Sequence, residues 1–251
     1  MRSSIHVTGV VQGVGFRPHV HRLATELSLS GFVANGLDGV VIEVDGETSA
    51  VALFVDCLSS TAPLLARIDS VQVVDIAVVP EPAYFGEKFR IVDSIGHGEP
   101  GTPVLVPADA ALCVDCRGEL TEPTDRRFRH AFVNCTSCGP RLTIATSVPY
   151  DRATTTMAGF AMCERCRSEY AAPADRRFHA EANCCAECGP RLRFVRSQTD
   201  HDGNRFDVGS MVNGDGEAIA RAISALRDGE IVAVKGIGGY HLAVDAGNEA
   251  P

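Results

Sequence analysis

The stretch Val7-Thr8-Gly9-Val10-Val11-Gln12-Gly13-Val14-Gly15-Phe16-Arg17-Pro18 decides how the first part of the chain folds. Apolar residues largely alternate from Ile5 to Val11, which is typical of a half-buried strand. A glycine-rich turn follows, and Pro18 begins an apolar set with helical spacing, as at the first turn of a helix. The stretch therefore predicts a strand, a glycine-rich loop and a helix in immediate succession.

The residues that follow predict a small α+β domain. Further strands are expected at residues 32–35, 40–44, 68–79 and 88–92, and a second helix at residues 47–59. We interpret the order as βαββαβ, which is typical of a ferredoxin-like sandwich of two helices on one antiparallel sheet. We expect this domain to be complete in residues 1–93.

The chain after this domain contains an internal repeat. Residues 94–108 carry three glycines and three prolines and predict a linker. Beyond it, two CxxC pairs, an Asp-Arg-Arg-Phe element and a Cys-Gly-Pro-Arg-Leu element recur at an offset of 50 residues. We place this tandem module at residues 109–200, with repeats at about 113–138 and 163–188.

The cysteines of the module predict two structural zinc sites. Eight of the ten cysteines form four CxxC pairs, which in a reducing cytosol indicates metal rather than disulfides. Zinc prefers four tetrahedral ligands, and paired CxxC units at this spacing are commoner in zinc ribbons or fingers than in iron–sulfur proteins. We favour one site within each repeat, although spacing alone also allows sites shared across the repeats. Cys57 and Cys184 are interpreted as non-ligands. The expected ligands are Cys113, Cys116, Cys135, Cys138, Cys163, Cys166, Cys185 and Cys188.

The glycine-rich loop carries a candidate anion site. A loop of this kind before a helix can point several backbone N–H groups inward, and the helix N-terminus adds a partial positive charge. Arg17, directly after the loop, offers a planar fork of donors for two phosphate oxygens. Many glycine turns before helices merely connect two elements, so the loop alone does not decide between these roles.

The complete loop resembles the acylphosphatase signature almost position for position. Gly31-Phe32-Val33-Ala34-Asn35, followed by Asp38-Gly39, resembles the second motif of that family. The resemblance implies that Arg17 binds the phosphate and that Asn35 positions the attacking water, a role that an amide fills without the charge repulsion of a carboxylate. It also implies that the phosphate is cradled by the backbone of Gln12, Gly13, Val14, Gly15 and Phe16.

The last segment extends the resemblance to a longer protein. Residues 201–251 predict a helix at 218–226 and a buried strand at 230–234, followed by Lys235-Gly236-Ile237-Gly238-Gly239. Together, the acylphosphatase-like domain, the repeats and this turn resemble the N-terminal part of the hydrogenase-maturation carbamoyltransferase family HypF. The resemblance implies that residues 201–251 begin a YrdC-like nucleotide-binding domain, in which Lys235 contributes to ATP binding.

The same resemblance implies a relay of reactions. The first domain would cleave carbamoyl phosphate, the YrdC-like domain would activate the carbamate with ATP, and the carbamoyl group would pass to a cysteine of a HypE-type maturation partner. ATP is expected only for the full-length protein, because the chain holds only the opening of that domain. Two alternatives stay open: a stand-alone acylphosphatase, and a zinc-stabilised scaffold that docks a maturation partner without catalysis.

Composition narrows the expected environment and partners. The formal net charge of −9 argues against nucleic-acid and anionic-membrane partners, which usually require a clustered basic surface. No stretch approaches the roughly 20 apolar residues of a membrane span, and we expect a cytoplasmic protein. Because the phosphate loop and the cysteine module are predicted to be separate domains, a strong chelator should destabilise residues 109–200 and leave hydrolysis largely intact.

Overall fold

The computed structural model describes most of the chain, namely residues 1–76, 88–96, 105–199, 205–236 and 239–248. Within these residues, none of the helices has the length and apolar character needed to cross a membrane. The chain divides into two compact units, which are described separately. The first unit comprises residues 1–112, 134–159 and 164–183, and the second comprises residues 113–133, 160–163 and 184–251.

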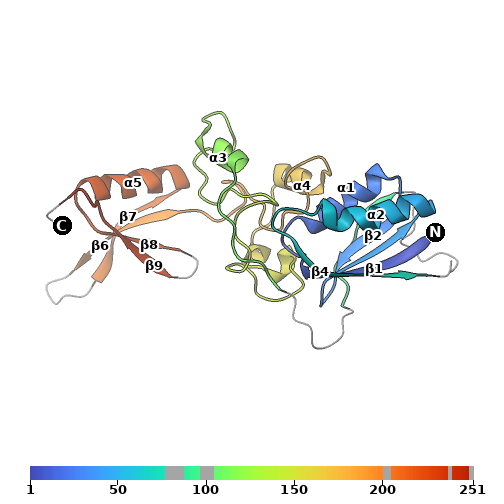
Figure 1. The fold of residues 1–251 in the computed structure, drawn as a ribbon. Coiled ribbons are helices and arrows are strands. Elements are labelled where there is room, and N and C mark those ends of the chain that lie inside the picture. The colour runs from blue at the N-terminus through green and yellow to red at the C-terminus, as the bar shows by residue number, and fades with distance from the viewer. Residues whose placement is uncertain (77–87, 97–104, 200–204, 237–238, 249–251) are drawn as a thin grey trace. The chain divides into compact units, whose positions relative to one another are not determined.

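The first unit is built on a five-stranded sheet with two helices on one face (Figure 1). The strand order is β4-β1-β3-β2-β5, and neighbours pair antiparallel except at one edge, where β5 runs parallel to β2. The elements are β1 (Arg2–Val10), α1 (Phe16–Glu26), β2 (Ser30–Asn35), β3 (Val40–Asp45), α2 (Thr48–Ser60), β4 (Arg67–Asp75) and β5 (Phe89–Ile91).

The predicted ferredoxin-like sandwich is confirmed, with β5 as a fifth strand that the order βαββαβ does not count. The expectation of a wholly antiparallel sheet is wrong at β5, because apolar alternation indicates a strand but not the direction in which it pairs. Phe89 is buried and joins the core, which places this short strand beside β2. The end of the predicted strand 68–79 and much of the predicted linker 94–108 lie outside the described residues.

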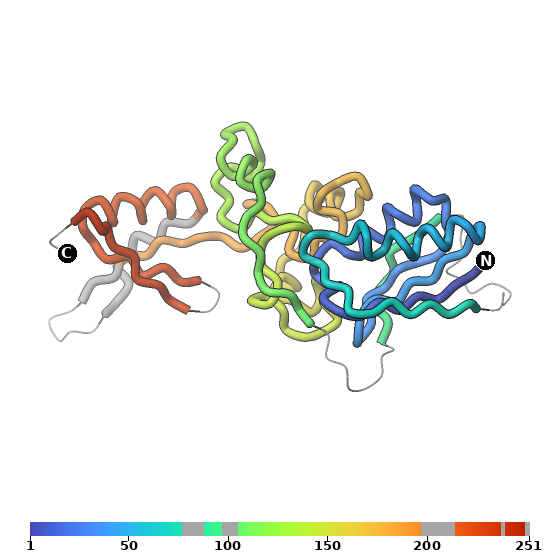
Figure 2. The backbone as a smooth tube through the Cα atoms, viewed as in Figure 1, coloured from blue at the N-terminus to red at the C-terminus, as the bar shows by residue number. Residues whose placement is uncertain are grey.

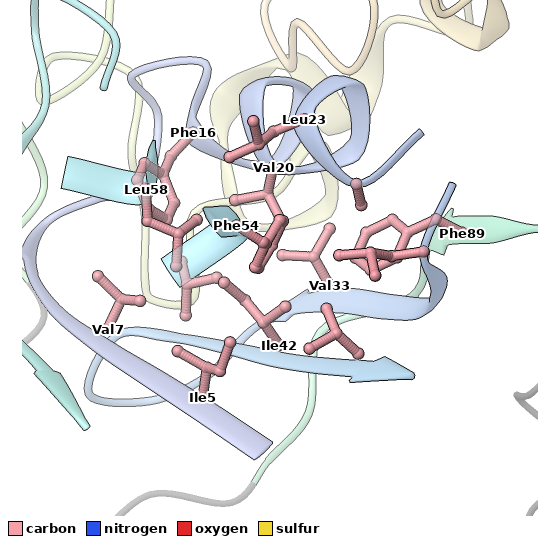
Figure 3. Close-up of a cluster of buried hydrophobic side chains, with 14 of the residues drawn as sticks. Ile5, Val7, Phe16, Val20, Leu23, Val33, Ile42, Phe54, Leu58 and Phe89 are labelled. Atoms are coloured by element: carbon pink, nitrogen blue, oxygen red, sulfur yellow. The ribbon is translucent and has the colours of Figure 1, made fainter. Parts of the chain in front are cut away.

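The core between sheet and helices holds the loop after β1 in place (Figure 3). Alternate residues of β1 are buried from Ser3 to Val7, and Ile5 and Val7 join this core. From α1, Phe16 and Val20 enter the same core at the spacing that one helix face provides. Burial of each such side chain stabilises the fold by about 1.5–3 kcal/mol, so the loop between β1 and α1 has two rigid supports.

The segments that carry the cysteines are mostly loops and turns (Figure 2). Each repeat has one short helix, α3 (Val114–Thr121) or α4 (Glu164–Ala171), and the 3-10 turns η1 (Arg152–Thr154) and η2 (Thr156–Gly159) lie between the repeats in sequence. Such segments contain little regular structure, so their stability depends on interactions other than a hydrophobic core of their own.

The final segment contains two antiparallel hairpins and a helix. These are β6 (Arg193–Thr199), β7 (Arg205–Asn213), α5 (Asp215–Arg227), β8 (Val232–Lys235) and β9 (Tyr240–Ala243). Helix α5 extends the predicted helix 218–226, whereas β7 lies in a polar stretch that does not predict a strand. The strand predicted at 230–234 is present as β8, but it is not buried, since Val234 is 47% exposed.

Candidate active site and metal sites

The loop between β1 and α1 has the geometry of an anion cradle. Gly13 and Gly15 adopt positive φ angles of 69° and 75°, which bend the backbone just before the first residue of α1. Among the described residues, none accepts a hydrogen bond from the backbone N–H groups of Gly13 to Phe16. These donors and the helix N-terminus together favour a bound anion.

The side chain of Gln12 fixes this loop to two other segments. Its Nε2 donates to the carbonyl oxygens of Gly36 and Gly39, both at 2.8 Å, and its Oε1 accepts from the N–H of Tyr150 at 2.8 Å. Gln12 is fully buried, so the amide is satisfied internally. Its side chain therefore holds the loop in shape and is not available to a bound phosphate.

Arg17 points into the same region and carries two carboxylate partners. Its Nη2 lies 2.7 Å from Oε1 of Glu181 and 2.9 Å from Oδ1 of Asp151. The side chain is only 9% exposed. Since both carboxylates contact the same nitrogen, Nε and Nη1 have no partner among the residues that the structure describes. Arg17 therefore keeps donors that can bind a phosphate oxygen pair.

Asn35 ends β2 with its amide in a defined orientation. Nδ2 donates to the carbonyl oxygen of Tyr150 at 3.1 Å and to Oδ1 of Asp151 at 3.3 Å. Oδ1 of Asn35 is buried and has no hydrogen-bond partner among the described residues. An unpaired buried acceptor is costly unless a ligand or a water occupies it. The amide nitrogen is thus engaged by the protein, while the amide oxygen remains available to hold a water.

These groups line one cavity of about 30 Å³. The sheet domain contributes the loop, the start of α1 and Asn35, and the cysteine module contributes the other wall, which includes Thr136, Arg141, Tyr150, His179 and Glu181. Nδ1 of His179 is a second buried polar atom in this lining without a described partner. A cavity of this volume is large enough for an ordered water molecule.

The cavity lining combines the guanidinium groups of Arg17 and Arg141 with the carboxylate of Glu181 and neutral rings. Burial raises the pKa of Glu181, while Arg17 opposes that rise. Burial also raises the pKa of Tyr150 to about 12 and lowers the pKa of His179 to about 4, with Arg17 adding to the second effect. At neutral pH the tyrosine and the histidine are therefore uncharged, and Arg17 is the positive group available to an anion.

Sequence patterns did not indicate the wall contributed by the cysteine module. Asp151 lies outside both repeats, and Glu181 stands at a position where the first repeat has Ala131. Arg141 belongs to the repeated Cys-Gly-Pro-Arg-Leu element, yet it lines the cavity and donates to the carbonyl oxygen of Gly13. A departure from the repeat, such as Ala131 against Glu181, is the one signal that could have identified this wall.

The eight paired cysteines gather into two groups of four. In each group the ligand atoms all lie within 4.8 Å of one another, and the groups are Cys113, Cys116, Cys135 and Cys138, and Cys163, Cys166, Cys185 and Cys188. The Sγ atoms of Cys135 and Cys138 lie 3.8 Å apart, as do those of Cys185 and Cys188, which matches the edge of about 3.8 Å of a tetrahedron with Zn–S bonds of about 2.3 Å. Such sulfurs are too far apart for disulfides. The donor set fits Zn²⁺.

Comparison with known proteins agrees with this arrangement. Residues 3–91 match the acylphosphatase family, and residues 112–145 and 162–195 match the HypF finger. The chain is 50% identical over 248 residues to a carbamoyltransferase HypF of Rhizobium leguminosarum and 47% identical over 248 residues to a carbamoyltransferase HypF2 of Cupriavidus necator, covering 99% of the chain in both cases. The chain belongs to the HypF family.

The relatives are much longer than the chain, which spans 28% and 29% of these two HypF proteins. A solved structure described as full-length HypF in the phosphate- and nucleotide-bound form superposes with a TM-score of 0.81 at 40% identity, over 98% of the chain and 30% of that HypF. The HypF fold of this region is therefore shared, and the activity of the longer relatives belongs to the proposals below.

The two remaining cysteines lie outside the sulfur groups. Cys57 is half-buried in α2. Cys184 is buried, with Sγ 3.5 Å from Nε2 of His130, whose Nδ1 lies 2.7 Å from Oδ2 of Asp215. The order of these groups is that of a nucleophile, a base and an orienting carboxylate, but all three are at most 7% exposed, so no substrate reaches the sulfur. Their contacts tie the chain around Cys184 to α5.

Lys235 lies at the end of β8 and is not among the residues that line the phosphate cavity. Its Nζ lies 5.6 Å from the centre of the Tyr240 ring, and the residue is exposed. The turn that follows is closed by a hydrogen bond of 2.7 Å from the Gly236 N–H to the Gly239 carbonyl oxygen, and residues 237–238 lie outside the described part. The predicted nucleotide contact stays a prediction.

Proposed function

We propose that the chain hydrolyses carbamoyl phosphate in the cavity beside Arg17. In a longer HypF protein this step would supply carbamate for ATP-dependent carbamoyl transfer to a cysteine of a HypE-type partner, with Lys235 near the nucleotide. The observation that carries the proposal is the convergence on one cavity of unpaired backbone donors, Arg17 and the unpaired Oδ1 of Asn35. The similar HypF proteins are carbamoyltransferases, which favours carbamoyl phosphate among acyl phosphates.

The residues of the cavity suit an in-line displacement at phosphorus. The N–H groups of Gly13 to Phe16 and the free donors of Arg17 bind the phosphoryl oxygens and stabilise the charge that they carry in the transition state. Oδ1 of Asn35 accepts a hydrogen bond from the attacking water and orients it. The bond from the water oxygen to phosphorus forms while the bond to the carbamoyl oxygen breaks, which yields inorganic phosphate and carbamate. Carbamate is a good leaving group, so a general base is not required.

We further propose that the two groups of four cysteines bind two Zn²⁺ ions with a structural role. A closed set of four thiolates leaves no open position for a substrate or a water. The bound ions would fix the loops that carry Tyr150, Asp151 and Glu181, because these segments contain little regular structure of their own. All ten cysteines are free of disulfides, which fits the reducing cytoplasm as the location.

The proposal is tested by phosphate release from carbamoyl phosphate. Arg17→Ala should lower kcat/KM at least about 100-fold, because it removes the main cation at the transferring group. Arg22→Ala is the matched control, since Arg22 lies on the same helix with a side chain that is 67% exposed, and it should stay within about twofold of the unsubstituted chain. Undiminished turnover in Arg17→Ala would refute the assignment. Partner binding without any phosphate release would favour a non-catalytic scaffold.

A further inference from the structure

The two carboxylates on Arg17 differ in one respect that matters for a substrate. Both contact Nη2, at 2.7 Å from Glu181 and 2.9 Å from Asp151. Glu181 lines the cavity, whereas Asp151 is not part of the lining and instead receives hydrogen bonds from Asn35 and Ser94. Asp151 therefore contacts Arg17 and Asn35 from outside the cavity lining, whereas Glu181 faces the space that a ligand would occupy.

The carboxylate of Glu181 is held rigidly as a hydrogen-bond acceptor. The N–H of Arg152 donates to Oε2 at 3.0 Å, and the hydroxyl of Tyr170 lies 3.0 Å and 3.2 Å from the two oxygens. Nη1 of Arg152 also donates to the backbone carbonyl oxygen of Glu181 at 2.7 Å. With Arg17, three donors share the roughly four acceptor positions of an ionised carboxylate, so one position remains.

Only one part of carbamoyl phosphate can approach this carboxylate favourably. The phosphoryl oxygens and the carbonyl oxygen carry negative charge and are repelled by it. The amino group of the carbamoyl end is the sole hydrogen-bond donor of the dianion. Acetyl phosphate has a methyl group at the same place, which would leave the buried carboxylate without a partner there and raise the cost of binding.

We propose that Glu181 recognises the carbamoyl amino group and thereby selects carbamoyl phosphate over acyl phosphates that lack this group. The inference rests on the proposed hydrolysis and goes beyond it, because it assigns the substrate preference to a residue of the second repeat. With the amino group on Glu181 and the phosphoryl group on Arg17, the substrate is bound at both ends. The acylphosphatase loop supplies the chemistry, and the cysteine module supplies the specificity.

The test compares kcat/KM for carbamoyl phosphate and acetyl phosphate in the zinc-loaded chain, with spontaneous decomposition subtracted. In Glu181→Gln, the Arg152 N–H and the Tyr170 hydroxyl keep the amide oxygen in the place of Oε2. A donating NH2 group then replaces Oε1, which can no longer accept a hydrogen bond from the carbamoyl amino group. The carbamoyl-to-acetyl ratio should fall about 10- to 100-fold. Asp151→Asn is the matched variant: it also removes a carboxylate from Arg17, lowers both rates together and should leave the ratio within about twofold.

Several outcomes separate the inference from the proposed function. An unchanged ratio in Glu181→Gln, an equal change in Asp151→Asn, or no preference in the unsubstituted chain would overturn the inference alone. Failure of the unsubstituted chain to hydrolyse either substrate would overturn both. Competitive inhibition by inorganic phosphate shows that the cradle of each variant is folded. Glu181→Asp, which keeps the charge but withdraws the carboxylate, should give an intermediate ratio if Glu181→Gln does not fold.

Discussion

The two repeats of the cysteine module have the same cysteine pairs and the same arginine contacts, but they differ in one short segment. In the first repeat, Nε of Arg127 donates to the carbonyl oxygen of Cys184, and in the second, Nε of Arg177 donates to that of Asn134, both at 3.0 Å. Each arginine thus contacts the residue just before the last CxxC pair of the other repeat. The charged side chains of the repeated element therefore build the module itself, which is consistent with an acidic chain.

The segments after these arginines have diverged toward different partners. Residues 129–134 present His130, which lies 2.7 Å from Asp215, whereas residues 179–184 present Glu181, which lies 2.7 Å from Arg17. Position 131 is alanine and position 180 is alanine, so neither contact has a counterpart in the other repeat. The two repeats thus contain equivalent loops, of which one contacts α5 and the other forms a wall of the phosphate cavity.

Removal of zinc should produce the largest effect on this arrangement. From the sequence we expected a chelator to leave hydrolysis largely intact. The cavity lining predicts the opposite, because Thr136, Tyr150 and Glu181 belong to segments that the metal would hold. Displacement of such groups by about 1 Å can cost about 100-fold in rate, and we expect a loss of that order. The measurement is phosphate release against bound zinc during chelation.

A matched substitution separates ligand loss from general damage to cysteines. Cys166→Ser should bind less zinc and lose hydrolysis, whereas Cys57→Ser, in α2 and outside both sulfur groups, should keep both. Full turnover after complete zinc release would show that the second repeat does not shape the cavity.

The next effect concerns stability and should appear in the first repeat alone. His130→Ala removes the contact with Asp215 and leaves a buried carboxylate with only the N–H of Leu192, 2.7 Å away, as a described partner. We expect the free energy of unfolding to fall by about 2–3 kcal/mol, measured by urea denaturation. Hydrolysis by the folded variant should be unchanged, because His130 is not part of the cavity lining. A large loss of kcat in this variant would contradict the division of roles between the repeats.

The smallest effect that we expect is a pH dependence of stability, which arises from His179 and has no counterpart at Arg129. Both residues adopt left-handed φ angles, 51° and 57°, at equivalent positions. Burial lowers the pKa of His179 from 6.5 to about 4, so between these values the unfolded chain binds a proton that the folded chain does not. Stability is therefore complete above pH 6.5 and falls as the pH drops toward 4.

Two asparagine variants test this pH dependence, since asparagine tolerates the left-handed conformation. In His179→Asn the free energy of unfolding should fall less between pH 7 and pH 4.5 than in the unsubstituted chain. Arg129→Asn should keep the original slope, because arginine does not titrate in this range. Equal slopes in all three proteins would show that His179 is not held neutral by the fold.

The sequence allowed the local features of this molecule to be predicted, but not its long-range contacts. Strands, helices and the glycine loop follow from periodicity and turn chemistry within about ten residues. The contact between Arg17 and Glu181 joins positions 164 residues apart, and no pattern around either residue indicates the other. The same holds for Asp151, which reaches Asn35 over 116 residues. The prediction of separate domains followed from the strand and helix pattern, the linker and the repeat, whereas the cavity depends on long-range packing.

The central claim is that the acylphosphatase loop and the second repeat form one phosphate site. Its most direct test is a titration of the zinc-loaded, ¹⁵N-labelled chain with inorganic phosphate, followed through backbone amide chemical shifts. The account predicts the largest shifts at Gly13 to Phe16 and at residues 180–182, with little change at residues 130–132 of the first repeat. Shifts confined to the loop, with residues 180–182 unaffected, would contradict it.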